Sequence, residues 1–284
     1  MVCAACSVGW HSSFFFSTLN LPFSGAPPVG APLNGSTLGR QMSHDNLLSE
    51  RLNQVGILLL LLISADTAFV IVHLVHELSP FLGSSLYSLY TERGYSEIFQ
   101  YVKTYWIVIM LAVLWWHTRE CVYVTWMLLY AYLLCDDAFQ IHERGGDAIA
   151  RHWGYESALG LGAHDFGELT VSGLFGLVFL VLIGIMYLRS TRDARNASKD
   201  MTLLFGVIVC FGVIIDTLHV VAEGGYGEVV FGVVEEGGEM FATSVVCWYV
   251  LNLVERRGNA PTSLWQLTKT ALTSACSGRA KARC

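Results

Sequence analysis

The sequence predicts an all-α membrane protein, a polytopic bundle of about six transmembrane helices with both termini in the cytoplasm. The first observation is composition, because 54% of the 284 residues are hydrophobic and only 14% are charged, against roughly 25% charged in a typical soluble domain. The second is a set of apolar runs, each near the ~20 residues that a helix needs to cross a bilayer. The third is the uneven distribution of lysine and arginine between the two sides, which sets the orientation.

The same composition excludes other classes of protein. A disordered chain would need low hydrophobicity, and a net charge of −6 without a dense basic stripe argues against nucleic-acid binding. Cys121, Cys135, Cys210 and Cys247 lie in or beside apolar runs, where a free thiol behaves as a small hydrophobe, so no disulfide framework is expected. Membrane lipids are the expected partners, and the oligomeric state stays open.

The first segment of the chain differs from the rest. Residues 1–41 are rich in Gly, Pro, Ser and Phe, contain one basic residue, Arg40, and lack the positive region with which a secretory signal begins. We interpret them as a disordered tail or an over-extended start, with Met42 as the alternative first residue. Residues 42–255 then form the membrane domain, and residues 256–284 form a basic cytoplasmic tail near anionic lipid headgroups.

The apolar runs are expected to be helices, because backbone groups in lipid must be satisfied within the segment. Strands of a membrane barrel would alternate polar and apolar residues, and these runs do not. In order they are Val55–Leu78, Ile98–His117, Val122–His142, Phe166–Leu188, Met201–Val221 and Glu239–Val254, the last reaching full length if it starts at Glu235. Two pairs of small residues, Ser172 with Gly176 and Gly206 with Cys210, are typical of close helix packing.

Basic residues gather on the side of the membrane that holds the N-terminus. That side carries 13 of the 17 lysines and arginines, and it is therefore expected to be cytoplasmic. The opposite side, with the helix ends that open onto it, holds 16 of the 23 acidic residues and only 4 basic ones. The acidic side is where we expect function to reside.

Asp66 lies near the middle of the first run, and His73 follows seven residues later, nearly on the same helical face. A charge at this depth costs at least ~2.5–3.5 kcal/mol on insertion scales, so Asp66 is expected to face a partner or a wet cavity. Two interpretations stay open. Asp66 is either a neutral, hydrogen-bonded residue that pins two helices, or part of an ion or proton path together with His73.

The ends of the third and fourth runs carry further acids. Asp136, Gln140 and Glu143 lie at i, i+4 and i+7, and so on one helical face. His142 joins that face only if the helix loosens at residues 144–146. In the fourth run Glu168 follows Asp165 by one turn, a position that also suits the helix dipole.

The fifth and sixth runs add the most specific local signal. Asp216 and His219 stand at i, i+3 at the end of the fifth run, and Glu235, Glu236 and Glu239 stand at the start of the sixth. By topology these acidic ends meet in one layer on the acidic side. Like charges this close need a cation, shared protons or basic partners.

A bound divalent metal is one interpretation of this layer, because carboxylates with imidazole favour Zn, Fe or Mn. The protein would then be a membrane-embedded hydrolase or oxidase with a lipidic substrate, and His142 and Glu143 would be its catalytic residues. Two alternatives stay open: a carboxylate network that handles protons or cations in a transporter, channel or sensor, and a purely structural set of hydrogen bonds. The candidate metal ligands are Asp136, Asp137, Glu168, Asp216, His219, Glu236 and Glu239.

Several stretches resemble an uncharacterised family of multi-span bacterial membrane proteins of cyanobacterial type. They are LISADTAFVIVH, ERGYSEIFQYVKTYWIV, YLLCDDAFQIHERGG, HDFGEL, DTLH and EEGGEMF, and they extend from about residue 55 to 255. The resemblance implies a bacterial inner membrane. It supplies no activity, so it does not choose among the functions above.

Overall fold

The computed structural model describes residues 35–157, 161–221 and 227–256, and the side chains of 56–157, 161–218 and 230–256. The expected C-terminal tail and residues 1–34 of the expected N-terminal segment lie outside these ranges. The chain divides into two units after Asn46. The described part of the first unit is the beginning of one helix, and the second unit holds all the elements discussed below.

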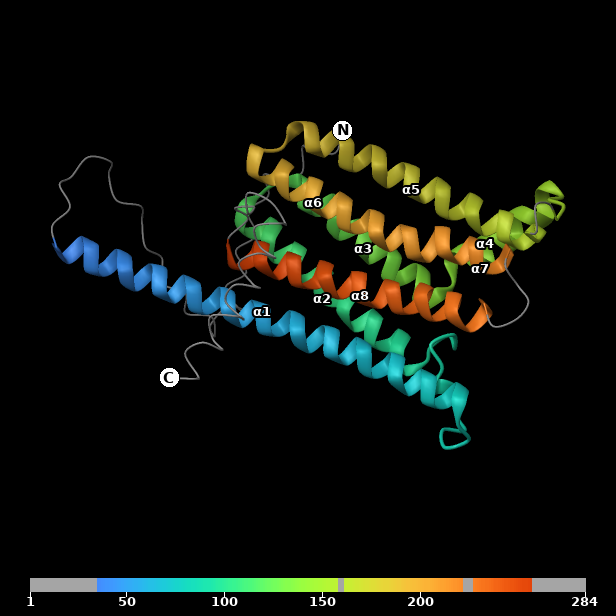
Figure 1. Ribbon diagram of the computed structural model, residues 1–284. Coiled ribbons are helices and arrows are strands. Elements are labelled where there is room, and N and C mark those ends of the chain that lie inside the picture. The colour runs from blue at the N-terminus through green and yellow to red at the C-terminus, as the bar shows by residue number, and fades with distance from the viewer. Residues whose placement is uncertain (1–34, 158–160, 222–226, 257–284) are drawn as a thin grey trace, which may run out of the picture. The chain divides into compact units, whose positions relative to one another are not determined.

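Helices make up the described chain, which contains no strand, and the predicted all-α class is confirmed (Figure 1). Two of the elements are not α-helices: η2 is a short 3-10 turn and η3 is a π-helical segment. In chain order the elements are α1 (Gly35–Leu78), η2 (Ser85–Tyr87), α2 (Tyr95–Thr118), α3 (Cys121–Phe139), α4 (Ile141–Trp153), α5 (Ala163–Arg189), α6 (Arg192–Val209), η3 (Cys210–Ile215), α7 (Asp216–Val221) and α8 (Gly227–Glu255).

Six of the described helical stretches are long and apolar enough to cross a membrane, as the sequence predicted. The sixth begins earlier than predicted, because α8 continues without a break through its glutamates. The fifth also begins earlier, since the polar first turns of α6 are helical too. The stretches are Gly56–Leu78, Tyr95–Thr118, Cys121–Phe139, Ala163–Arg189, Arg192–Leu218 and Val230–Glu255.

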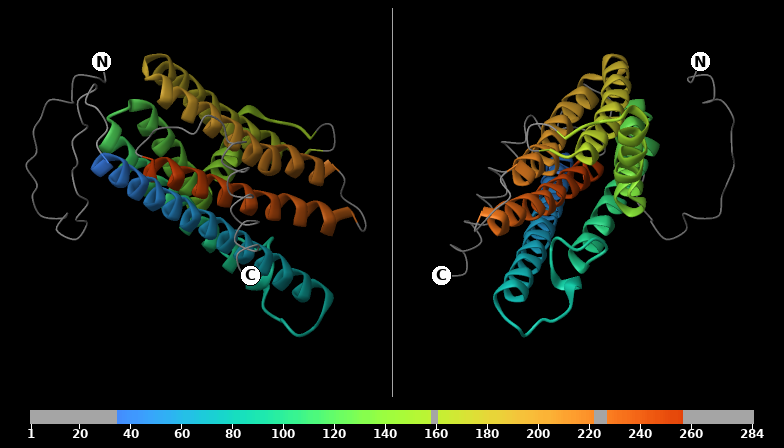
Figure 2. Two further views of the ribbon diagram at one scale, coloured as in Figure 1. Left: turned by 60° about the vertical axis from the view of Figure 1, so that its left-hand side comes forward. Right: turned by 90° about the vertical axis from the view of Figure 1, so that its right-hand side faces the viewer.

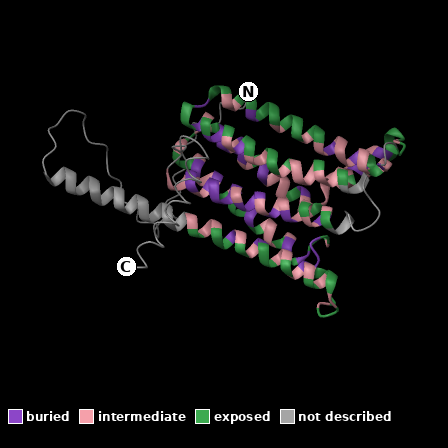
Figure 3. Cartoon of the chain, viewed as in Figure 1, coloured by how far each residue is buried: buried purple, intermediate pink, exposed green. Residues whose placement is uncertain are grey.

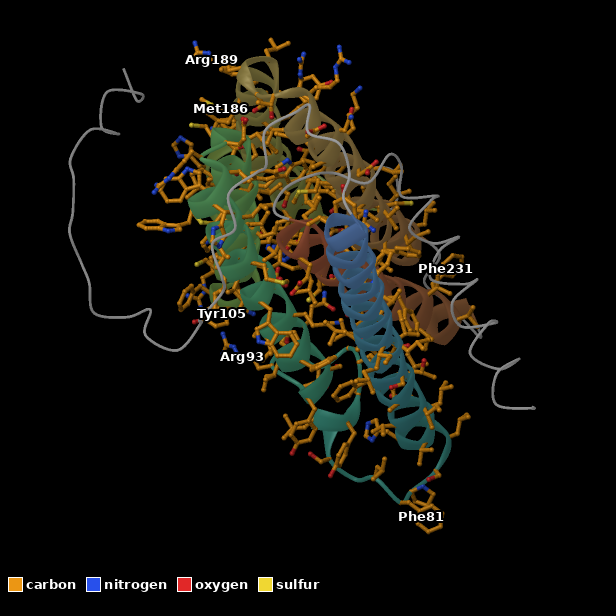
Figure 4. The ribbon with its side chains drawn as sticks, turned by 90° about the vertical axis from the view of Figure 1, so that its left-hand side faces the viewer. Phe81, Arg93, Tyr105, Met186, Arg189 and Phe231 are labelled. Carbon is orange, nitrogen blue, oxygen red and sulfur yellow. The ribbon has the colours of Figure 1, made fainter. Side chains whose placement is uncertain are left out.

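The connections gather at two ends of the bundle. One end, here called the acidic end, holds the loop between α1 and α2, helix α4 and the first turns of α5 and α8 (right-hand side of Figure 1). The other, the basic end, holds the α2–α3 and α5–α6 connections. Phe81, in the loop after α1, and Arg189, the last residue of α5, are labelled among the side chains in Figure 4. The side chains predicted to share the acidic layer therefore belong to one end.

Helix α8 lies at the centre of the bundle, and α5 and α6 lie at its periphery. In the most apolar stretch of α8, 67% of the residues are buried, against 6% in that of α5. This contrast is visible in Figure 3. The two views in Figure 2 show α5 running alongside α6. Leu174, Leu177 and Leu180 of α5 are exposed, as expected for side chains that face lipid. Gly176 and Gly206 have open space beside them, so these two predicted small-residue contacts do not form within the described chain.

The third helix ends sooner than predicted. Gln140 adopts the left-handed conformation (φ 54°, ψ 49°) between α3 and α4, so the chain bends there and not at residues 144–146. Asp136, Gln140 and Glu143 therefore do not share one regular helical face. The bend is what brings the two halves of this segment against each other.

Helices α4 and α5 cross at a pair of glycines. A methyl group added at Gly167 would lie 2.2 Å from the carbonyl oxygen of Gly146, and one added at Gly146 would lie 2.6 Å from the backbone nitrogen of Glu168. Both positions need glycine because the two backbones touch there. This contact fixes α4 across the start of α5 at the acidic end.

We predict that Gly167→Ala lowers the stability of the bundle by about 1–3 kcal/mol, the usual cost of overpacking. Thermal unfolding in detergent, followed by circular dichroism, measures the effect. The control is Gly176→Ala on the same helix, where an added methyl group meets nothing within 4 Å and alanine is the better helix former. Equal destabilisation by both variants would contradict the glycine crossing.

Candidate functional site

A buried ion pair lies between two of the helices that are long and apolar enough to cross a membrane. Lys103 of α2 and Asp66 of α1 are both fully buried, with 2.8 Å between Nζ and Oδ1. Asp66 was expected to face a partner or a wet cavity, and its partner is this lysine. Sequence analysis missed Lys103, which it counted among the basic residues of the acidic side.

The ion pair is closed by hydrogen bonds from α8. Lys103 Nζ also donates to the carbonyl oxygen of Met240 at 2.8 Å and to Ser244 Oγ at 3.1 Å. The Ser244 hydroxyl in turn donates to Asp66 Oδ2 at 2.5 Å. All three ammonium hydrogens and both carboxylate oxygens thus have partners, which a buried charge pair needs to offset its desolvation. The group joins three helices, α1, α2 and α8.

His73 lies two turns from Asp66 on the same buried face of α1. The backbone N–H of Leu89 donates to its Nδ1 at 3.2 Å, and the ring of Tyr90 packs edge-on against it with centroids 4.6 Å apart. His73 Nε2 is buried and has no hydrogen-bond partner within the described chain. The imidazole therefore links the loop between α1 and α2 to α1, while its Nε2 atom makes no hydrogen bond within the described chain.

Polar side chains continue from the ion pair toward the acidic end between α2 and α8. Gln100, one turn before Lys103, donates from Nε2 to Glu239 Oε2 at 3.3 Å. Tyr101, the residue after Gln100, donates to Glu97 Oε1 at 2.5 Å, and Glu97 lies in the first turn of α2, toward the acidic end. The sequence already indicates this row of polar residues, because positions 97, 100 or 101, and 103 or 104 recur on one face of a helix.

Glycines let Glu239 sit against the π-helical segment η3. The Glu239 Oε1 atom occupies the place where a side chain at Gly212 would be, 1.7 Å from the position of an added Cβ. On α8, Gly238 leaves room for the ring of Phe211, which would lie 2.3 Å from an added methyl. The neighbour that Gly238 admits is therefore η3, which contains Phe211. Single π-helical turns are frequent at functional sites.

Asp136 and His142 come together across the bend at Gln140. Asp136 accepts from the backbone N–H of His142 at 2.8 Å, and its other oxygen lies 3.1 Å from His142 Nδ1. Asp136 thus supplies the capping acceptor for the first turn of α4. Its hydrogen bond to His142 raises the pKa of that imidazole to about 9, with the charges of Asp136, Glu168 and Glu143 acting in the same direction against partial burial.

The other acids of α4 and α5 have nearby partners as well. Glu143 accepts from Gln140 Nε2 at 3.1 Å. Glu168 lies 2.7 Å from His164 Nε2, whose Nδ1 is 2.8 Å from Asp147. His164, which sequence analysis had not singled out, therefore links α4 and α5. An open hollow of about 260 Å³ beside them is lined by Tyr155, Glu156, Phe166 and Thr170.

The expectation of a metal-dependent hydrolase or oxidase is wrong for the part of the chain that the structure describes. No three His, Cys, Asp or Glu side chains converge there as metal ligands. The physical reason is that these side chains are committed elsewhere: Asp136 caps α4, Glu168 pairs with His164, and Glu239 bonds to Gln100. Asp137 and Asp216 act electrostatically on Glu239, and Asp216 also acts on Glu236. The side chain of His219 lies outside the described residues.

We predict that His142 titrates near pH 9 in the folded protein, well above the ordinary histidine value of 6.5. The contact with Asp136 then stabilises the fold fully below pH 6.5, and this contribution is lost as the pH rises through about 9. NMR titration of histidine ring signals, assigned with His142→Gln, gives the value. Asp136→Asn should return it toward 6.5, and a wild-type His142 that titrates there would contradict the contact.

Comparison with known proteins gives one match. The family model described as "Domain of unknown function (DUF8692)" matches residues 53–253, close to the range 55–255 over which the sequence motifs gave a resemblance. No curated protein and no solved structure matches the chain. Because the matched range covers well over half of the 284 residues, the chain belongs to the DUF8692 family.

Proposed function

We propose that this chain is a proton-responsive membrane protein, in which one proton gained or lost at the Asp66–Lys103 pair controls the packing of α1, α2 and α8. The observation that carries the proposal is the pair itself, fully buried and fully hydrogen-bonded in the membrane-spanning part of the bundle. The proposal needs neither a metal nor a ring of carboxylates at the helix ends.

The physical argument is that the pair is neutral only as a pair. If Asp66 takes up a proton, the Lys103 ammonium loses its counter-charge. If Lys103 loses a proton, the Asp66 carboxylate loses its counter-charge. Removing one partner of a buried pair costs roughly 3–5 kcal/mol, so either change favours a packing in which the remaining charge meets water. Protonation and helix packing are then thermodynamically linked.

His73 enters the proposal as a second position for a proton on the buried face of α1. Its unpartnered Nε2 and its contact with the loop at Leu89 place it between the ion pair and the acidic end. Asp66 and His73 thus remain candidate proton-holding residues of α1, which the seven-residue spacing placed on one helical face.

The setting of this function is a multi-pass membrane protein. Six long apolar helices are compatible with that class. We propose that the membrane is a bacterial inner membrane, with lipids as partners, the basic end in the cytoplasm and both termini on that side. Residues 42–255 would be the membrane domain, residues 1–41 a tail or an over-extended start, and 256–284 a basic tail.

Cys247 offers a probe of packing at the pair. It is buried on α8, three residues after Ser244, and it interacts electrostatically with Lys103. In a chain whose other cysteines are replaced by serine, the rate of N-ethylmaleimide labelling is measured in the folded protein and after unfolding in SDS. The ratio of the two rates at one pH gives the protection of Cys247, free of the titration of the thiol.

We predict that Asp66→Asn and Lys103→Met each lower this protection by at least about tenfold, since each leaves one charge or polar group unmatched. The double variant Asp66→Asn/Lys103→Met should recover most of it. Protection of the wild type should fall when the pH is moved far enough to add or remove a proton at the pair, whereas that of the double variant should not. Identical pH profiles for the two would show a purely structural pair and would refute the proposed function.

A further inference from the structure

We infer that Glu239 is the residue through which the Asp66–Lys103 pair exchanges its proton, and that the exchange occurs with the acidic end. The inference rests on the proposed function and names the route for the same site. It follows from the position of Glu239 on α8 and from the packing of its carboxyl group against Gly212 of η3. It also follows from the different side chains that α2 presents on the two sides of the pair.

Glu239 stands one helical turn from the ion pair on both helices that flank it. On α8 it precedes Met240, whose carbonyl oxygen accepts from Lys103, and it lies five residues before Ser244. On α2 its partner Gln100 lies three residues before Lys103. One turn of helix is about 5.4 Å along the axis, a separation that a carboxylate on a flexible side chain can close.

The carboxyl group of Glu239 fits against η3 because Gly212 has no side chain. Its Oε1 atom fills the space beside Gly212 in η3, while Oε2 accepts from Gln100. Both oxygens are therefore positioned, one by a hydrogen bond and one by the backbone of a π-helical segment. Such a segment departs from the regular hydrogen-bond pattern of an α-helix.

Charged groups from every helix packed around Glu239 bear on it. Glu235 and Glu236 belong to its own helix, Asp137 to α3 and Asp216 to α7. Glu97 of α2 acts on Glu236. These acids lie toward the acidic end, and groups of like charge at short range favour sharing protons. A proton reaching Glu239 therefore comes from this set and from water beyond it.

On α2 the opposite direction from the pair is apolar. Beyond Lys103 and Thr104, the fully buried residues of α2 are Ile107, Leu111 and Leu114. On α8 the buried residues of the corresponding stretch include Val246 and Val250 but also the polar side chains of Cys247, Tyr249 and Asn252. Proton transfer needs groups that donate and accept, and in this direction α2 supplies none among its fully buried residues.

The transfer conserves charge. The O–H bond of protonated Glu239 breaks, an O–H bond forms on Asp66, and Asp66 gives up its ion pair with Lys103. The Ser244 hydroxyl, already bonded to Asp66 at 2.5 Å, is the nearest link. Glu239 remains as a carboxylate and is reprotonated from the acidic end. The reverse sequence releases the proton.

The test measures how fast the Lys103 ammonium hydrogens exchange with water, by NMR of the protein labelled with ¹⁵N at lysine Nζ. Lys103→Met assigns the signal. We expect Glu239→Gln to slow the exchange at least about tenfold, because amides do not relay protons as carboxyls do. Gly212→Ala should slow it similarly, since the added methyl displaces the flexible end of Glu239 and leaves the backbone in place.

Gly206→Ala is the matched control on α6, where an added methyl meets nothing within 4 Å, and it should leave the rate unchanged. Cys247 protection at neutral pH confirms that each variant is folded. An unchanged rate in both Glu239→Gln and Gly212→Ala would overturn the inference. Equal slowing in His73→Gln would also overturn it, because the route would then run along α1.

These outcomes are separable from failure of the proposed function, which is decided by the pH profile of Cys247 protection. In liposomes the side of exchange is tested directly by changing the pH on one face only. In a parallel chain that keeps only Cys121, labelling of this exposed residue at the basic end with an impermeant maleimide reports the orientation. Cys247 protection should respond when the acidic end faces the altered buffer, and a response from the basic end would contradict one-sided exchange.

Discussion

The ion pair between Asp66 and Lys103 is the interaction on which the rest of the bundle depends. Two charges in the membrane-spanning part of a protein are costly, and here the cost is offset only because α8 supplies Met240 and Ser244 as further partners. Helix α8 must therefore stay central, which agrees with its being the most buried of the six membrane-capable helices described. The periphery, α5 above all, is left to face lipid with aliphatic side chains.

Sequence analysis predicted the helices and the inward orientation of Asp66 because these follow from hydropathy and from the cost of a charge in lipid. It missed the role of Lys103 because it counted this lysine with the few basic residues of the acidic side and did not place it against Asp66. A signal was present: Lys103 stands at i−4, i−8 and i−11 from Ile107, Leu111 and Leu114, so it continues a buried apolar face. A cation on such a face indicates an acidic partner on another helix, and Asp66 was available.

The metal site failed for a different reason. Spacing along a helix shows which acids share a face, but it does not show which hydrogen-bond donors meet them. Asp136 accepts a hydrogen bond from the first turn of α4, after a bend at Gln140 that falls inside the predicted third run, and Glu168 pairs with His164. The predicted meeting of the acidic helix ends was right in topology. The local backbone places these acids against separate neighbouring side chains, so within the described residues they do not form a single metal-binding cluster.

Glycines connect the acidic end to the ion pair mechanically. The small-residue pairs that sequence analysis chose include Gly176 and Gly206, which have open space beside them. At three other glycines the space that a side chain would take is occupied by a neighbour: Glu239 beside Gly212, Tyr90 beside Gly232 and Phe211 beside Gly238. These contacts place α8 against η3 on one side and against the loop that carries Tyr90 and contacts His73 on another. A shift of α8 that breaks Ser244 away from Asp66 must therefore also move Glu239 in its seat and Tyr90 against His73. The charge pair and the polar end of the bundle can change only together, which is the property that a proton-responsive protein requires.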